Sequence, residues 1–489
     1  MQNTKQLFGA DGIRGNIDQY PFRQEDLIKL SQALAKWWLN KRIHQPVVLL
    51  SMDTRESSQR IKFILDEGFR RAGVEIRDAG ILPTAAISFL VARNPELTGG
   101  VSITASHSLL WESGIKVFDQ KGVKLSDSDE REIENFFHSD AHETGNQNHI
   151  SKVHSETDYL QQYIQGMVNE FSAVNWRKDR ILVDCANGAT YQSAGPIFNT
   201  LGIPHLLRNV VPNGTNTNIS SGSEHVRTYP LEFAKEIQTS GAHLGMALDG
   251  DADRVVFVDK QGLFYDGDML LAILAIFLDE KKLLKNKRVV ITQMSNSGLI
   301  EHLGNHGIQT QQVNNGDKHI TDVLLKDDLT LGGEQIGHII VRNNDFRITG
   351  DGLYTGLWIL KALSQVSNPT LHDLLHGLRK WPQINASVML GGRIHSKSEK
   401  IPGLAELREQ VRNEFPDLSR FECRPASTEP VYRIMLESRD IQVPVLVEQA
   451  LRLARHVQSH YDRLGEPIEI LDCVTGGRIS PNASSGFPG

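Results

Sequence analysis

Apolar strands alternate with amphipathic helices along most of the chain. Val47–Leu50 is a short apolar run that predicts a buried strand, apolar residues at helical spacing follow over 61–69, and Gly73–Ile76 begins a second strand. The same order recurs from Ile181 to Ile203 and from Val289 to Ile308, and a glycine after each helix suits the left-handed C′ position. The pattern predicts three similar α/β domains with mixed, largely parallel sheets.

The pattern changes after about residue 367. Strands are predicted over Ala386–Leu390 and Val431–Glu437, and helices over 404–415 and 443–458, which indicates a smaller α+β domain. The expected domains are residues 1–155, 156–260, 261–368 and 369–465. Residues 466–489 are expected to form a disordered tail, since Gly, Ser, Pro and Asn dominate from Thr475 onward.

Charge and composition narrow the classes of partner. The 52 Lys and Arg residues against 59 Asp and Glu give a net charge of −7, which argues against nucleic-acid binding through bulk charge. Small anions can still bind where a few Arg and Lys residues cluster. The longest strongly apolar run, Met269–Leu278, is about half of a membrane span and predicts a core helix, so no membrane association is expected.

The cysteines and the first residues suggest the compartment. Cys185, Cys423 and Cys473 lie far apart and match no metal or disulfide spacing, which is typical of a reducing cytoplasm. Residues 1–15 contain no apolar core and no small-residue cleavage pattern, so we expect a cytoplasmic protein.

The strongest chemical signal is the segment Asp249–Arg254, with sequence DGDADR, between the apolar runs Leu244–Leu248 and Val255–Val258. Three carboxylates at alternate positions on a loop after a strand can converge on one hard cation, Mg²⁺ or Ca²⁺, and Mg²⁺ is favoured when a phosphate completes the coordination. The alternative is an acidic, solvated turn. The apolar strands on both sides and the adjoining Arg254 favour the metal site.

Four further loops carry polar groups suited to an anionic or sugar ligand, although each could also be an ordinary turn. Thr104–His107 follows a predicted strand at Gly100–Ile103, so Ser106 stands at a strand end, where α/β folds present reacting groups. Lys116 follows a little further along the chain. The opening segment Phe8–Gly15 combines three glycines with Arg14, which can bind an oxyanion. The other two loops are Gly332–His338, with Glu334 and His338, and Arg424–Pro430, with Ser427, Thr428 and the nearby Arg433.

In this order, the five segments resemble the motifs of the α-D-phosphohexomutase superfamily, and the similarity extends from Leu7 to about Gln458. Within the superfamily the chain is most similar to the bacterial phosphoglucosamine mutase family. The residues that carry this narrower resemblance are Gly333–Gln335, Asp184–Ala189, Gly222–His225 and Asn315–Lys318.

The resemblance implies domains arranged around a central cleft and a phosphoryl group carried by Ser106. One Mg²⁺ would be held by phosphorylated Ser106 with Asp249, Asp251 and Asp253. The implied reaction converts glucosamine 6-phosphate into glucosamine 1-phosphate, a cell-wall precursor, through a 1,6-bisphosphate that also acts as activator. A hexosamine phosphate is thus the expected partner, and the protein is expected to be a monomer or homodimer.

The resemblance also assigns roles to the surrounding side chains. Arg14, Lys116 and Arg254 would neutralise charge, and His107 or His338 would transfer a proton or bind substrate. The residues expected to bind the sugar or its non-reacting phosphate are Glu334, Lys318, Arg424, Ser427, Thr428 and Arg433.

Several positions depart from the family pattern. They are Ala10, Ser108 and Leu109, Ser113, Ile336, and Ala426 with Ser427. Losing a hydroxyl that binds a buried polar group costs about 1–3 kcal/mol, so two losses would weaken binding by roughly thirtyfold to twenty-thousandfold. Alternative activities are therefore a phosphomannomutase or phosphoglucomutase, or a weakly active paralogue that binds a phosphosugar or a protein partner.

Overall fold

The computed structural model describes residues 7–9, 11–41, 45–108, 111–139, 158–343, 347–367, 369–391, 400–426, 431–463 and 465–479. The chain forms two compact units. The first contains residues 1–226, 231–295 and 303–376, and the second contains residues 227–230, 296–302 and 377–489. No helix among these described residues is long and apolar enough to cross a membrane.

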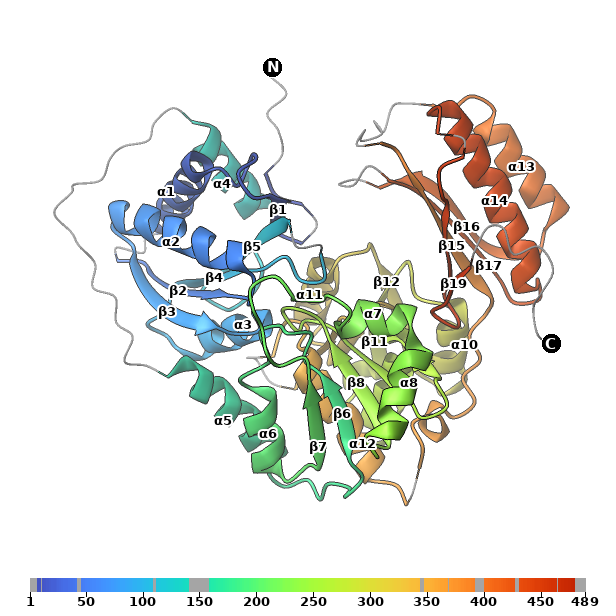
Figure 1. Ribbon diagram of the computed structural model, residues 1–489, viewed down its shortest axis with the longest axis horizontal. Helices are drawn as coiled ribbons and strands as arrows, with labels where there is room; N and C mark the ends of the chain where they lie inside the picture. The colour runs from blue at the N-terminus through green and yellow to red at the C-terminus, as the bar shows by residue number, and fades with distance from the viewer. Residues whose placement is uncertain are drawn as a thin grey trace. The chain divides into compact units, whose positions relative to one another are not determined.

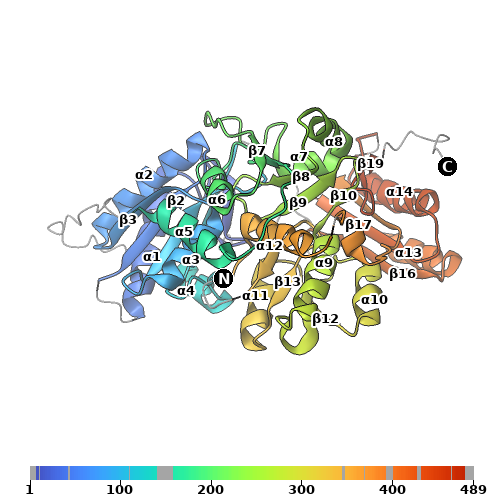
Figure 2. The same ribbon diagram turned by 90° about the horizontal axis from the view of Figure 1, so that it is seen from below.

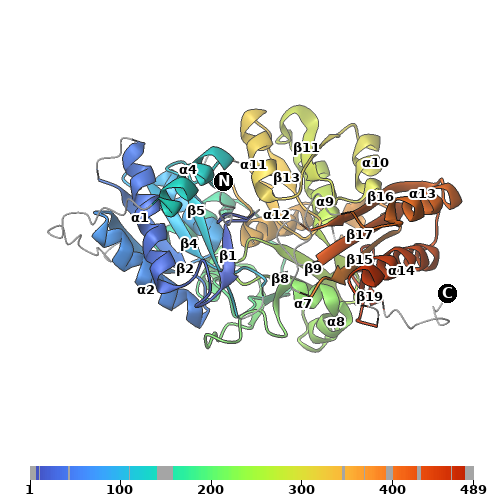
Figure 3. The same ribbon diagram turned by 90° about the horizontal axis from the view of Figure 1, so that it is seen from above.

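The first sheet of the first unit has the strand order β1-β5-β4-β2-β3. Its strands are β1 (Ile13–Asn16), β2 (Val47–Met52), β3 (Glu75–Ile81), β4 (Gly99–Ile103) and β5 (Glu112–Phe118). The helices α1 (Gln24–Asn40), α2 (Glu56–Arg71) and α4 (Asp127–His138) share one hydrophobic core with one face of this sheet (Figures 1 and 3). The helix α3 (Thr84–Arg93) covers the other face, where Gly100 lets Ile87 and Val91 approach the backbone.

The second sheet repeats this arrangement with the order β10-β9-β8-β6-β7. Its strands are β6 (Ile181–Asp184), β7 (His205–Arg208), β8 (Leu244–Leu248), β9 (Val255–Asp259) and β10 (Phe264–Tyr265). The helices along this part of the chain are α5 (Tyr159–Phe171), α6 (Ala194–Leu201), α7 (Gly222–Thr228) and α8 (Pro230–Thr239). The predicted left-handed glycine after α6 is confirmed, because Gly202 has φ 71°.

The third sheet has the order β12-β11-β13-β14. Its strands are β11 (Arg288–Thr292), β12 (Gln309–Val313), β13 (Leu331–Gly333) and β14 (Ile339–Val341). The helices here are α9 (Gly267–Glu280), α10 (Ser297–Asn305), α11 (Asp317–Lys326) and α12 (Gly352–Ser364), with short 3₁₀ turns at Lys285–Lys287 and Asp373–Leu375. The apolar run at Met269–Leu278 is a buried helix, as predicted, and α9 lies beside α12 (Figure 2).

The second unit is built on an antiparallel sheet with the order β16-β17-β15-β18-β19. Its strands are β15 (Gln383–Met389), β16 (Leu418–Pro425), β17 (Val431–Ser438), β18 (Glu469–Asp472) and β19 (Arg478–Ile479). The helices α13 (Leu404–Glu414) and α14 (Val443–His460) pack against it through a shared hydrophobic core.

The predicted fold class is confirmed, since three mixed α/β sheets precede an antiparallel sheet. The prediction of a disordered tail from residue 466 is wrong over 466–479. Ile470 there is buried in the core of the second unit, and β18 pairs with β15 through four residues. The polar composition concealed these few apolar residues, which an existing sheet edge could pair and bury. Residues 480–489 lie outside the described part of the chain.

Candidate active site

Three of the sequence-predicted loops occupy equivalent places in the three mixed sheets. In each sheet a strand that pairs in parallel on one side is followed by a loop and an antiparallel strand. The loop from β4 to β5 carries Ser106, the loop from β8 to β9 carries Asp249, and the loop from β13 to β14 carries Glu334. The repeated topology therefore explains why the candidate site residues follow the corresponding strand in each sheet.

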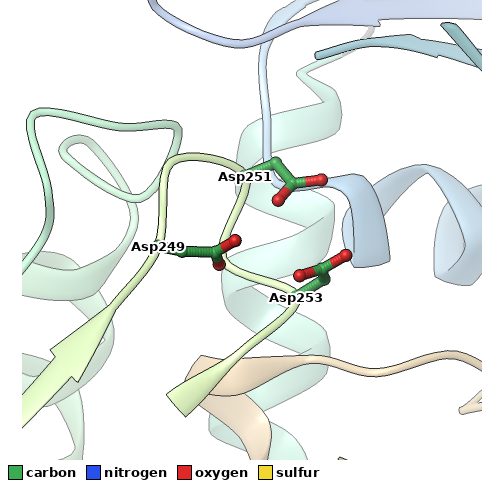
Figure 4. A group of neighbouring side chains, drawn as sticks. All are labelled: Asp249, Asp251 and Asp253. Carbon is green, nitrogen blue, oxygen red and sulfur yellow. The ribbon is translucent and has the colours of Figure 1, made fainter. Parts of the chain in front are cut away.

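The three aspartates of the DGDADR segment form one buried cluster. One carboxylate oxygen of each of Asp249, Asp251 and Asp253 lies within 4.8 Å of the others, and the three side chains point toward one another from the β8–β9 loop (Figure 4). Ala252, between the last two, is left-handed with φ 57°, which turns the chain sharply. The local turn thus brings alternate carboxylates to the same side.

Ser106 lies directly beside this cluster. Its Oγ donates to Asp249 Oδ2 at 2.6 Å, and the residue is fully buried. Its backbone is also left-handed, with φ 51°, a conformation that costs about 1–3 kcal/mol for a residue with a side chain. The surrounding structure must therefore hold the serine in place.

A buried network that sequence reasoning missed holds the serine loop. Arg55 Nη2 donates to the carbonyl oxygens of Ser106, at 3.1 Å, and Ser108, at 2.7 Å. Its Nε lies 3.2 Å from Asp53 Oδ2, and that same oxygen accepts from Thr104 Oγ1 at 2.8 Å. Thr104 Oγ1 accepts the Ser106 N–H at 2.9 Å, which closes the network. The Asp-Thr-Arg sequence after β2 was the available signal.

Close backbone contacts around the β8–β9 loop explain two glycines, Gly250 within it and Gly188 after β6. A Cβ added to Gly250 would lie 2.7 Å from the Ser106 carbonyl oxygen and 2.8 Å from Asn218 Nδ2. A Cβ on Gly188 would lie 2.3 Å from the Gly250 carbonyl oxygen. Asn218 donates to the same Ser106 carbonyl at 2.7 Å. Side chains at these glycines would force the loops apart.

Lys116 reaches the aspartate cluster from β5. Its Nζ donates to Asp253 Oδ2 at 2.8 Å and to Asp251 Oδ2 at 3.0 Å, and it lies 3.2 Å from Asp11 Oδ2. Burial by itself would lower the pKa of Lys116, but these three carboxylates outweigh it and hold the pKa well above its usual value. Lys116 is thus a fixed cation at the aspartate cluster. Arg14 joins it through Asp11, since Arg14 Nη2 lies 2.7 Å from Asp11 Oδ2.

The charges within the cluster are unevenly balanced. Burial, reinforced by the Asp253 and Asp251 carboxylates, raises the pKa of Asp249 well above its usual value. Burial would also raise the pKa of Asp253, but Lys116 and His338 hold it well below its usual range. Three carboxylates this close repel one another unless cations balance them.

Two carboxylate oxygens in the cluster are suited to bind a metal ion. Asp251 Oδ1 and Asp253 Oδ1 are buried and have no hydrogen-bond partner within the described residues, whereas the Oδ2 atoms bind Lys116. A buried carboxylate oxygen without a partner is costly in an apolar environment. Hard oxygen donors of this kind fit a divalent cation such as Mg²⁺.

The third sheet adds a histidine and two acids. His338 Nδ1 lies 3.7 Å from Asp253 Oδ2, and its Nε2 lies 3.5 Å from Asp317 Oδ2. Burial by itself would lower the pKa of His338, but Asp253, Asp317 and Glu334 raise it above its usual value. Burial raises the pKa of Glu334, whose Oε1 accepts the Gly316 N–H at 3.1 Å. Asp317 was not among the expected site residues, although its segment was recognised.

His107 and Arg254 lie on the serine and metal loops. His107 Nδ1 is 3.4 Å from Ser106 Oγ. Although the His107 side chain reaches the surface, the Arg254 guanidinium lowers its pKa to about 3. Arg254 Nη1 lies 3.5 Å from Glu224 Oε1, and its backbone N–H donates to Asp249 Oδ1 at 3.2 Å. His107 is therefore neutral near neutral pH and suits hydrogen bonding.

Lys318 contacts other acids of the first unit. Lys318 Nζ forms ion pairs with Asp127 at 2.6 Å and Glu130 at 3.1 Å, both on α4. Arg424 and Arg433 belong to the second unit, where they face each other across β16 and β17. Ser427 and Thr428 lie outside the described residues.

Sequence comparison identifies three family domains along the chain. Residues 5–144 match phosphoglucomutase/phosphomannomutase alpha/beta/alpha domain I, residues 159–262 match domain II, and residues 266–380 match domain III. A phosphoglucosamine mutase from Dictyoglomus turgidum is 35% identical over 455 residues, which cover 93% of this chain and 98% of that protein.

Solved structures share the fold at lower identity. A phosphoglucomutase/phosphomannomutase family protein from Burkholderia thailandensis has a TM-score of 0.75 at 19% identity, covering 95% of this chain and 99% of that chain. The N-acetylphosphoglucosamine mutase of Aspergillus fumigatus, solved in complex with GlcNAc-6P and magnesium, has a TM-score of 0.64 at 16% identity, covering 93% and 96%.

Proposed function

The chain belongs to the phosphoglucomutase/phosphomannomutase (α-D-phosphohexomutase) superfamily, and from this premise we propose that it interconverts glucosamine 6-phosphate and glucosamine 1-phosphate. The observation that carries the proposal is the buried contact of Ser106 Oγ with Asp249 at 2.6 Å, inside a cluster that also contains Lys116. The similarity to phosphoglucosamine mutases supports the choice of sugar.

In this reaction Ser106 carries a phosphoryl group. A hydroxyl oxygen of the sugar phosphate attacks the phosphorus, the bond from phosphorus to Ser106 Oγ breaks, and a 1,6-bisphosphate forms. The bisphosphate then reorients, Ser106 Oγ attacks the phosphorus of its other phosphate, and the bond from that phosphorus to the sugar oxygen breaks, which releases the isomeric monophosphate. The hydroxyl proton leaves with the attack, and the released Ser106 Oγ takes up a proton; His338 lies close enough to the cluster to take part in this transfer.

Asp249, Asp251 and Asp253 would hold one Mg²⁺ together with the phosphorylated serine, because the two unpartnered oxygens are suited to it. When bound, the ion neutralises charge that develops on the transferring phosphoryl group. Lys116 supplies a second, fixed positive charge at the same point. Phosphoryl transfer depends mainly on such positioning and electrostatic stabilisation.

The remaining expected residues have proposed roles in binding. Glu334 is suited to a sugar hydroxyl, while Arg14, Arg254 and Lys318 are suited to phosphate or sugar oxygens. In the second unit Arg424, Arg433, Ser427 and Thr428 would hold the phosphate that does not react. We expect the protein to act in the cytoplasm in amino-sugar metabolism.

One observation favours a second candidate, a phosphomannomutase or phosphoglucomutase activity. Ile336 stands at the tip of the β13–β14 loop with 37% of its surface exposed, and its side chain offers no hydrogen bond to a sugar hydroxyl. Specificity for an amino sugar would then rest on other groups. A coupled assay on glucosamine, mannose and glucose phosphates, with Mg²⁺ and a 1,6-bisphosphate activator, compares the candidates directly.

The mechanism is tested by Ser106→Ala. This variant should fold normally and lose turnover, and intact mass should show phosphate on the native chain alone. Ser108→Ala is the matched control, since it lies in the same loop and only its backbone atoms are used for the contacts described. Full activity in Ser106→Ala would exclude a phosphoserine mechanism. No turnover of any sugar and no phosphorylation would leave a binding paralogue.

A further inference from the structure

A cavity of about 580 Å³ lies in the first unit, apart from the aspartate cluster. It opens where β6 and β8 begin, at Ile181 and Leu244, and it is also bordered by Asp259 at the end of β9. Asp249 instead follows the far end of β8. Because β8 spans about 17 Å, the cavity and the metal site occupy opposite edges of one sheet.

The walls of the cavity are apolar and come from separate parts of the chain. The residues that form them include Trp176, Ile203, Leu244, Leu360, Leu363 and Leu371, each less than 9% exposed. Leu360 and Leu363 lie on α12, which packs beside β8 and β9. A preformed volume of this size with a mainly apolar lining is typical of small-molecule sites.

The two acids at the rim of the cavity already accept hydrogen bonds or ion pairs from within the chain. Asp179 is occupied, because Arg177 Nε donates to its Oδ2 at 2.7 Å and His243 lies 3.9 Å from its Oδ1. Asp259 is occupied too, because it accepts from the Tyr265 hydroxyl at 2.9 Å and from two backbone N–H groups.

Lys260 differs from these acids. No hydrogen bond or ion pair of its ammonium group occurs in the part of the chain that the structure describes, although its backbone carbonyl accepts from Gln238. An ammonium at the edge of an apolar cavity attracts an anion, since the nearby carboxylates are already engaged. The rim therefore complements a ligand that accepts hydrogen bonds and carries negative charge.

We propose that this cavity binds a small amphipathic organic anion, with an aromatic or acyl body among the leucines and a carboxylate or sulfonate at Lys260. The site is separate from the proposed mutase chemistry. Binding can be measured without turnover, so it can be present or absent whatever sugar phosphate the protein converts.

The probe is 1-anilinonaphthalene-8-sulfonate, and its neutral analogue N-phenyl-1-naphthylamine has a similar body without the sulfonate. Fluorescence titration of the full chain should show one saturable site for the sulfonate probe. Lys260→Gln should weaken binding of the sulfonate probe by about fivefold or more and change binding of the neutral analogue by less than about twofold. Equal effects on both probes would overturn the assignment of the anion to Lys260.

Leu263→Glu tests the location, because Leu263 lines the rim and is 38% exposed. This substitution should weaken binding of the sulfonate probe by about tenfold or more. Leu325→Glu is the matched control, since Leu325 is 37% exposed on α11 and does not line the cavity. Equal effects of the two substitutions, or displacement of the probe by glucose 1,6-bisphosphate, would place binding elsewhere and overturn the proposal.

Discussion

Substituting Arg55 by lysine tests whether the buried network beneath the serine loop is needed for turnover. Arg55 is 2% exposed and spans two carbonyl oxygens, of Ser106 and Ser108, as well as the Asp53 carboxylate. A lysine keeps the positive charge but lacks the planar fork of donors, so it cannot make all three contacts at once. The substitution therefore removes support from the left-handed serine without removing the charge.

The magnitude follows from the lost contacts. One hydrogen bond from a charged donor to a buried carbonyl contributes about 1.5–3 kcal/mol. At about 1.4 kcal/mol per tenfold, kcat should fall by about tenfold to a hundredfold if the serine is correctly placed only when the bond is made. KM should change by less than about threefold, because a guanidinium buried beneath the loop contacts no substrate.

The assay is steady-state kinetics on glucosamine 6-phosphate, together with intact mass after incubation with glucose 1,6-bisphosphate. The mass measurement follows the phosphorylation of Ser106 whichever sugar is the natural substrate. Arg60→Lys is the matched control on α2, the helix that follows Arg55, since Arg60 makes an exposed ion pair with Asp18 and should change nothing measurable. An unchanged kcat in Arg55→Lys, or a change confined to KM, would refute the positioning role.

Three other results are expected. Gly250→Ala should slow turnover, because its Cβ would lie 2.7 Å from a carbonyl oxygen of the serine loop and overpacking costs about 1–3 kcal/mol. The control Gly304→Ala meets nothing within 4 Å and should stabilise the chain by about 0.5–1 kcal/mol in urea unfolding. Mg²⁺ at about 100 times its Kd should stabilise the native chain by about 2.7 kcal/mol in thermal unfolding, and Asp249→Asn should lose this response. Equal stabilisation of the native chain and the variant would argue against the metal site. Burial raises the pKa of Glu437 above 4.5, so the folded protein binds this proton more tightly than the unfolded chain, and the stability of the native protein falls as pH rises above that value. Glu437→Gln should therefore gain stability relative to the native chain between pH 4.5 and neutrality, whereas Glu422→Gln, at an exposed position, should show no such trend.

Three of the departures from the family pattern, Ile336, Ala426 and Ser427, fall on the loops proposed to bind the sugar or its phosphate. Ile336 is exposed on the β13–β14 loop, while the aspartate cluster and Ser106 keep the chemistry of the motif. In the proposed function, the chemical step and the choice of sugar would thus be carried by different loops. Substrate comparison, more than mutation of the aspartates, will distinguish the candidate activities.

Local sequence patterns were sufficient for several of the elements and for the central motif. The strand before Thr104, the strands on both sides of Asp249–Arg254 and the buried helix at Met269–Leu278 are each encoded by residues close together in the chain. The convergence of Asp249, Asp251 and Asp253 could be predicted for the same reason, since their carboxylates alternate along one loop and a single turn brings them together.

Only the tertiary structure decided which distant residues join that cluster. Asp11 meets Lys116 because it precedes β1, which pairs with β5. Arg55 supports Ser106 because the two residues follow β2 and β4, which are neighbours in the same sheet. No local periodicity encodes such contacts, because they depend on how strands order and pair. The pairing of β18 with β15 was missed for the same reason: a polar segment joins a sheet when an existing edge offers it hydrogen bonds and a place to bury a few apolar side chains.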